Sequence, residues 1–128
     1  MTPHEVVRRL IAEAIGQTVG DRIRPDRRYQ EDQLPAVAYT VEAAEPRRTL
    51  SGQAAAQYSG EIVIWTADCR QAVELAEAVA AQNGTEVENE QQLWTWLWTG
   101  GGFAADLVEE ETDRPEYQAT VRYVLWCT

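Results

Sequence analysis

Apolar residues recur at three- and four-residue spacing near the start of the chain, which predicts an amphipathic helix. The apolar stripe consists of Val6, Val7, Leu10, Ile11, Ala14 and Ile15. Thr2 is the expected N-cap, Pro3 suits the first helical turn, and Glu5 completes a T-x-x-E capping box. Gly16 is the expected stop, so the helix is predicted to end there.

Further along the chain, a period of two replaces the helical period and predicts strands. The first covers residues 36–41 and is expected to be half buried, with alternate residues on its two sides. A longer strand is expected from about Ala54 to Thr66. Pro and Gly between them, in residues 45–52, indicate a loop, so the two strands are predicted to form a protruding antiparallel hairpin. Residues 20–35 lack periodicity and are expected to be an irregular connection, with a short strand near Ile23.

A second helix is predicted after Asp68, which is a suitable N-cap. Its expected buried stripe consists of Val73, Ala76, Val79 and Ala80, and Asn83-Gly84 is the expected end. Residues 85–102 fit neither period, so their conformation stays open. Alternation resumes in residues 103–108 and 117–127, which predicts a closing antiparallel pair of strands.

The order of these elements predicts one α+β domain over residues 1–128. We expect a mainly antiparallel sheet of about four to five strands, with two helices packed on one face and a long protruding β-hairpin. In the last strand, Val124 and Trp126 place apolar side chains on the face that would otherwise be solvated. Either the sheet is covered on both sides or this face meets another subunit, so both residues are candidates for an interface.

The charge of the chain is distributed unevenly. The net charge is −10, yet residues 1–50 carry eight arginines and eight acidic residues, whereas residues 51–128 carry three arginines and thirteen acidic residues. Such a chain repels phosphates at long range, so we expect no binding of nucleic acid through a basic groove. No apolar run is long enough to span a bilayer and no secretion signal is recognisable, which predicts a soluble protein without membrane contact.

The side chains that most enzymes need are scarce. His4 is the sole histidine, there is no lysine, and Cys69 and Cys127 form no metal-binding motif, which excludes most nucleophilic, lysine-dependent and zinc chemistry. We therefore expect no enzyme and no cofactor. One catalytic alternative stays open, a hydrolase that binds a metal through Glu109 and Glu111, because these carboxylates would share one face of a strand.

Two further features suggest binding. In an extended segment, Trp94, Trp96 and Trp98 would line one face, which allows either core packing or a small binding module that stacks on a carbohydrate or peptide. At the expected hairpin tip, Arg47 and Arg48 are followed by Thr49 and Leu50. The guanidinium fork suits docking to carboxylates or carbonyls of a protein partner, so these residues are interface candidates.

A series of landmarks carries a family resemblance along nearly the whole chain. They are the short N-terminal helix, Val19-Gly20-Asp21-Arg22-Ile23 with Pro25, Leu34-Pro35-Ala36-Val37-Ala38-Tyr39, the Arg48-Thr49-Leu50-Ser51-Gly52 tip, the strand from Ile62 to Trp65, the Ala-rich helix from Ala72 to Ala81, and the strand from Tyr117 to Trp126. In this order they resemble the phage tail-completion family, which includes the tail-terminator and tail-to-head joining proteins of siphophages and gene-transfer particles. The Trp-rich stretch from Glu86 to Gly102 departs from the family pattern.

The resemblance implies a structural virion protein at the head-tail interface, made in the host cytoplasm during assembly. It implies a self-associated ring, typically a hexamer, which ends the tail tube and contacts both the tail-tube protein and the head-completion (stopper) protein. DNA would pass through the lumen of the ring without sequence-specific binding. The hairpin would reach toward a neighbouring subunit or the tube.

Overall fold

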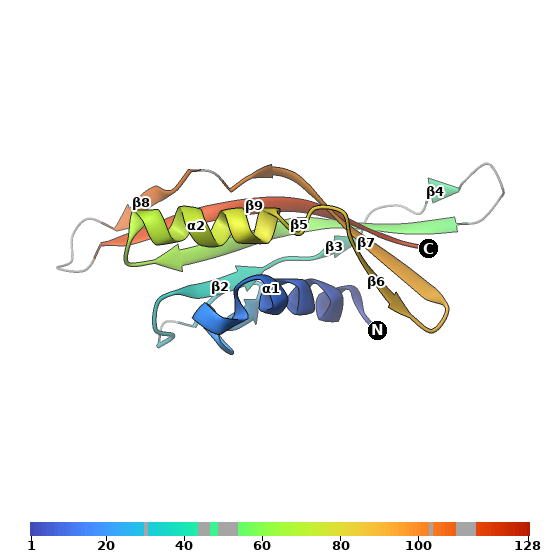
Figure 1. Ribbon diagram of the computed structural model, residues 1–128, viewed down its shortest axis with the longest axis horizontal. Helices are drawn as coiled ribbons and strands as arrows, with labels where there is room; N and C mark the ends of the chain where they lie inside the picture. The colour runs from blue at the N-terminus through green and yellow to red at the C-terminus, as the bar shows by residue number, and fades with distance from the viewer. Residues whose placement is uncertain (30, 44–46, 49–53, 103, 110–114) are drawn as a thin grey trace.

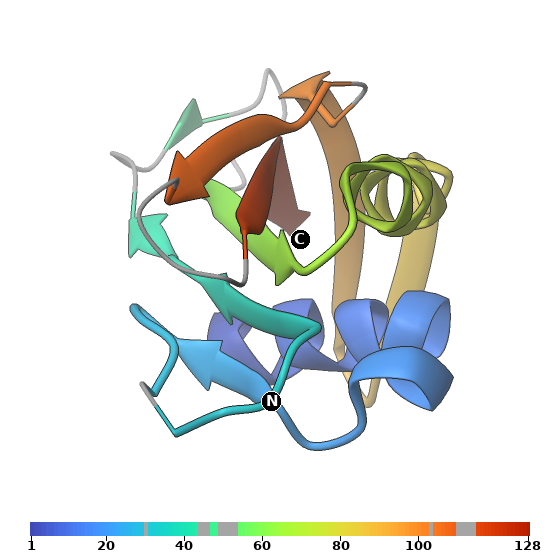
Figure 2. The same ribbon diagram turned by 90° about the vertical axis from the view of Figure 1, so that its left-hand side faces the viewer.

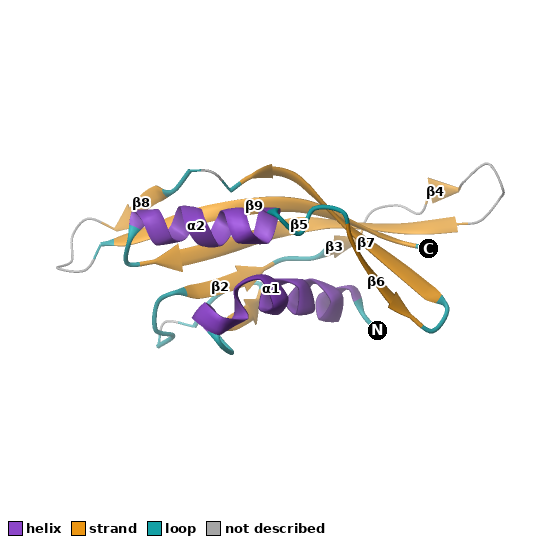
Figure 3. Cartoon of the chain, viewed as in Figure 1, coloured by secondary structure: helices purple, strands orange, loops and turns teal. Residues whose placement is uncertain are grey.

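The computed structural model describes residues 1–29, 31–43, 47–48, 54–102, 104–109 and 115–128. Two helices and a set of strands follow one another along the chain (Figure 3). The elements are α1 (Pro3–Val19), β1 (Ile23–Pro25), β2 (Ala36–Tyr39), β3 (Glu42–Ala43), β4 (Arg47–Arg48), β5 (Ala54–Thr66), α2 (Cys69–Ala80), β6 (Thr85–Asn89), β7 (Gln92–Gly101), β8 (Asp106–Glu109) and β9 (Glu116–Cys127).

The strands form one mixed sheet that is antiparallel except at one edge. Its order is β1-β2-β5-β9-β7-β6, with β3 and β4 also pairing with β5 and β8 also pairing with β9. Only β1 and β2 run parallel among the described strands. The predicted α+β class is confirmed, with nine strands in the described sheet instead of four or five.

The sheet curves around the two helices, which share its concave side (Figures 1 and 2). α1 packs against β1 and β2, while α2 packs against β5 and β9, and the helices also contact each other. Side chains from every one of these elements meet in a single apolar core. No helix in the described part of the chain is long and apolar enough to cross a membrane.

α1 begins as predicted but ends later. The Thr2 hydroxyl accepts a hydrogen bond from the Glu5 N–H, which confirms the capping box. Gly16 does not stop the helix, because the helix continues to the fully buried Val19 and is capped by Gly20. A glycine inside a helix costs only about 1 kcal/mol relative to alanine. Burial of Val19 offsets that cost.

α2 begins after Asp68, whose carboxylate accepts a hydrogen bond from the Arg70 N–H. Its buried residues are Ala72, Leu75, Ala76, Val79 and Ala80. Three members of the predicted stripe are thus confirmed, whereas Val73 is only partly buried. The helix ends at Ala80, before Asn83. Small side chains on the buried face allow α2 to lie close to the sheet.

The expected half-buried strand at residues 36–41 is buried on both sides. β2 covers Ala36–Tyr39, and all four of its residues are buried. The connection before it folds over the outer side of the sheet, because the Arg28 guanidinium lies 5.0 Å from the ring centre of Trp65, the β5 partner of Ala36. Arg28 also pairs with Glu116 of β9. The irregular segment therefore acts as a second layer.

The predicted hairpin is present and long. β5 spans thirteen residues and pairs antiparallel with β2, β3 and β4 in succession along one side. Its start and β4 extend beyond both helices (Figure 1). Residues 44–46 and 49–53, which include Thr49 and Leu50, lie outside the described residues.

Residues 85–102, for which the sequence predicted no conformation, form an antiparallel hairpin of β6 and β7. Trp94 and Trp96 of β7 point into the core, and the Trp96 ring stacks on Tyr123 of β9 at 5.9 Å between ring centres. A register shift between Trp98 and Gly100 then breaks the alternation. This irregularity explains why no single period fits the segment.

A close contact between strands fixes the middle of the sheet. The buried Tyr123 hydroxyl donates a hydrogen bond to the Thr40 carbonyl oxygen at 2.6 Å. Burial raises the pKa of Tyr123 well above its usual range, so the hydroxyl keeps its proton. Gly60, the register partner of Tyr123, lies beneath this bond, and its missing side chain leaves the space that Thr40 fills.

Candidate assembly interface

The outer face of the sheet carries partly exposed apolar side chains at its centre. In β9 the inward residues Val121, Tyr123 and Leu125 are buried, so Val124 and Trp126 lie on the opposite, outer face. The sheet register aligns Val124 with Leu97 of β7, on the same face. We call Leu97, Val124 and Trp126 the outer patch; each is partly exposed.

Two shallow hollows lie beside the outer patch. The first, of about 600 Å³, lies between β7 and β8 and includes Asp106 in its lining. The second, of about 500 Å³, includes Glu42, Glu61 and Val124. Arg122 lines both hollows and pairs with Glu61 at 3.3 Å. Both of these side chains are about half exposed, so the pair adds little stability and stays available to a partner.

The described residues among the predicted interface candidates lie on two strands, β9 and β4. Val124 and Trp126 lie in the outer patch. Arg47 and Arg48 form β4, where their backbones pair with Ala55 and Ala54 on the protruding hairpin. The register places both pairs toward the same end of β5, because Trp126 lies opposite Gln57 on one flank and Arg47 lies opposite Ala55 on the other (Figure 1).

The three-tryptophan row is not available as a stacking platform. Trp94 and Trp96 expose only 2% and 1% of their surface and belong to the core. Trp98 is partly exposed, and its indole Nε1 donates to the Gly100 carbonyl at 2.9 Å. The alternative of a module that binds a carbohydrate or peptide through this row is therefore wrong, because core packing already occupies two of the three rings.

The pair of carboxylates proposed for a metal hydrolase lies partly outside the described residues. Glu109 lies on β8, and Glu111 is outside the described residues. Within residues 1–29, 31–43, 47–48, 54–102, 104–109 and 115–128, no group of three or more His, Cys, Asp or Glu side chains is placed to hold a metal ion. The pair of Glu109 and Glu111 therefore stays a prediction.

The sequence did not predict an exposed aromatic site around Tyr29, in the segment between β1 and β2. Tyr29, with 49% of its surface exposed, lies under the Arg24 guanidinium at 4.2 Å from the ring centre. Arg24 also binds Asp32 with two hydrogen bonds of 3.1 and 3.0 Å, and Asp32 accepts a third from the Tyr29 N–H. The Arg24 hydrogen bonds hold the pKa of Asp32 below its usual range, so this carboxylate stays charged near neutral pH. We call the hollow lined by Arg27, Arg28, Tyr29 and Glu31 the Tyr29 corner.

The fold of the chain also occurs in a solved structure. The chain is similar to a chain of a solved structure titled "Virion of native gene transfer agent (GTA) particle", with a TM-score of 0.64 over 94% of this chain and 91% of that chain. The two chains share a fold. At 16% sequence identity, fold is all that the match shows. No family model matches the chain, and no curated protein matches it significantly.

Proposed function

We propose that this chain is a structural protein of a phage-like particle and acts as its tail-completion protein. Copies would close into a ring, six in the arrangement that the sequence resemblance implies, at the end of the tail tube. The ring would stop tube growth and contact the head-completion protein. The observation that carries this proposal is the shared fold with a virion chain over nearly the full length of both chains.

The surface of the molecule is consistent with a function in protein–protein binding instead of catalysis. The outer patch presents aromatic and aliphatic side chains with an arginine beside it, the combination that protein interfaces favour. The extended hairpin offers a second contact at one end of the molecule. The single histidine and the absence of lysine remove most of the reactive groups an enzyme would use.

The net charge of −10 suits a protein around a DNA channel. Acidic side chains facing a lumen would repel the phosphate backbone, so the DNA could slide without being held. Self-repulsion between acidic subunits must then be offset by short-range contacts, which the partly exposed apolar patch can supply.

The proposal is tested by removing the outer patch. We expect the double variant Val124→Ser with Trp126→Ala to fold but to complete tails about tenfold less often or worse, because an aromatic residue at an interface commonly contributes at least 1.4 kcal/mol. The measurement is the fraction of heads with attached tails in electron micrographs, with circular dichroism as the test of folding.

Arg9→Gln is the matched control, since Arg9 is exposed on α1, away from the sheet, and its one ion pair among the described residues is with Glu13. This variant should complete tails normally. Normal tail completion by the outer-patch variant would remove the patch from the proposed interface.

A further inference from the structure

The Tyr29 corner has the features of a preformed protein contact. Its tyrosine is exposed, yet the Arg24 stacking and the Asp32 hydrogen bonds already hold the loop in place. Tyrosine and arginine are among the residues that most often dominate binding energy at interfaces. A side chain ordered before binding loses less conformational entropy when a partner arrives.

Arg27 favours an acidic partner for this corner, whose lining also includes Glu31. Arg24 is paired with Asp32 and Arg28 with Glu116, but Arg27 is exposed and makes no side-chain hydrogen bond or ion pair within the described residues. Arg27 beside an exposed ring favours a surface that offers carboxylates around an apolar centre.

Such a surface exists elsewhere on the same chain. A hollow of about 340 Å³ at the turn between β6 and β7 is lined by Glu88, Glu90, Gln91, Gln92, Leu93 and Thr128. Leu93 is partly exposed, and the register pairs it with the exposed Glu88. Within the described structure, neither Glu88 nor Glu90 makes an ion pair. We call this site the acidic hollow.

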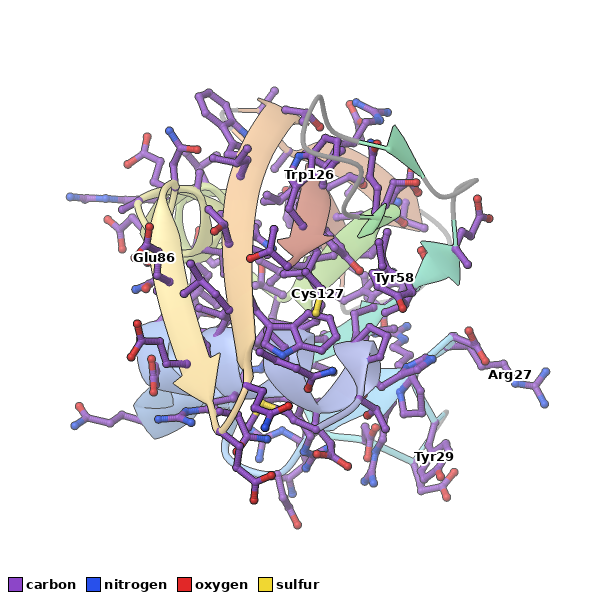
Figure 4. All side chains as sticks on the ribbon, turned by 90° about the vertical axis from the view of Figure 1, so that its right-hand side faces the viewer. Arg27, Tyr29, Tyr58, Glu86, Trp126 and Cys127 are labelled. Atoms are coloured by element: carbon purple, nitrogen blue, oxygen red, sulfur yellow. The ribbon has the colours of Figure 1, made fainter. Side chains whose placement is uncertain are left out.

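The two surfaces lie on opposite sides of the molecule. β1, which leads into the Tyr29 corner, and β6, which leads into the acidic hollow, are the two ends of the sheet order. In Figure 1 the turn between β6 and β7, which carries the hollow, lies at one end of the molecule, and the segment between β1 and β2 lies toward the other end. Figure 4 shows Arg27 and Tyr29 on the side away from the start of β6, where Glu86 lies. Complementary surfaces on opposite sides of one subunit produce a head-to-tail contact, which can close into a ring.

We infer that Tyr29 of one copy docks in the acidic hollow of a second copy, with Arg27 paired to Glu88 or Glu90. The aromatic ring of Tyr29 covers Leu93 of the second copy, and the guanidinium of Arg27 offsets the acidic charge of that copy. This contact rests on the proposed ring and identifies its subunit interface. Because both charged partners lie at the rim, the contact weakens as salt concentration rises.

Exchanging the charges of Arg27 and Glu88 tests the proposed contact between the Tyr29 corner and the acidic hollow. Native mass spectrometry and sedimentation over a concentration series should show closed oligomers of the wild-type chain. Arg27→Glu should raise the midpoint concentration of assembly about tenfold or more, since it places like charges together. Glu88→Arg should do the same, and the variant carrying both changes should recover assembly. Circular dichroism and thermal melting should show all three folded, because Arg27 and Glu88 make no side-chain contacts that the described fold depends on.

Arg70→Glu is the matched charge reversal at a site 85% exposed on α2, and it should assemble like the wild type. Wild-type assembly by both single variants would overturn the inference and leave the proposed ring intact. A wild-type chain that stays monomeric at every concentration would contradict self-association, and with it both proposals. If Arg27→Glu instead lowers retention of duplex DNA without altering assembly, the corner binds phosphates and the inference is wrong.

Discussion

Gly60→Ala is expected to destabilise the chain by at least about 3 kcal/mol and to leave little folded protein, at the severe end of overpacking. A Cβ at this position would overlap the Thr40 carbonyl group and lie 2.8 Å from the Tyr123 hydroxyl oxygen. The clashing group of Thr40 is its backbone carbonyl, which accepts the hydrogen bond from Tyr123. Neither Thr40 nor Tyr123 can therefore move away without breaking this buried hydrogen bond. Urea unfolding followed by circular dichroism measures the loss.

Gly16→Ala is the matched control for this substitution. A Cβ at Gly16 meets its nearest neighbour, Ala12 Cβ, at an ordinary 3.6 Å, and alanine is the better helix former. We expect this variant to be more stable than the wild type by about 0.5–1 kcal/mol. Wild-type stability of Gly60→Ala would contradict the close approach of the Thr40 carbonyl to Gly60 of β5.

Trp96→Ala is the second large effect, with an expected loss of about 3–5 kcal/mol in the free energy of unfolding. The Trp96 side chain exposes 1% of its surface and stacks on Tyr123, so its removal leaves a cavity between β7 and β9. The measurement is the same urea titration, with the slope of the transition checked to confirm two-state unfolding.

Trp126→Ala provides the contrast, because Trp126 is partly exposed on the outer face. We expect it to cost clearly less stability than Trp96→Ala while impairing tail completion. Equal stability losses would mean that the outer patch is part of the folding core. A smaller loss for Trp96→Ala than for Trp126→Ala would contradict the assignment of inner and outer faces of β7 and β9.

The long regular elements were predictable because each buries one face. The alternation along residues 54–66 predicted β5 with its observed bounds, and the alternation at the end of the chain predicted β9. The same alternation placed Val124 and Trp126 on the outer face, where they lie. Periodicity succeeds in these cases because the strands keep one side toward the core where they pass the helices.

The sequence did not predict the conformation of β7 or the Tyr29 corner, and each of these failures has a physical cause. Trp94 and Trp96 point inward on β7, but partly exposed apolar residues also occupy the outer side and a register shift follows Trp98. The Tyr29 corner depends on the pair between Arg24 and Asp32, which lie eight residues apart in an irregular segment. No local period encodes that pair, so the sequence did not reveal that Arg27 makes no ion pair within the described residues.

We propose that the chain acts by assembly into the tail of a phage-like particle. Electron cryo-microscopy of particles from a producing strain, compared with particles from a strain lacking this chain, tests it most directly. We predict density that fits a ring of this fold between the tail tube and the head, and tails without heads, of irregular length, when the chain is missing. Complete particles of normal tail length without the chain, or particles in which no density fits it, would contradict the account.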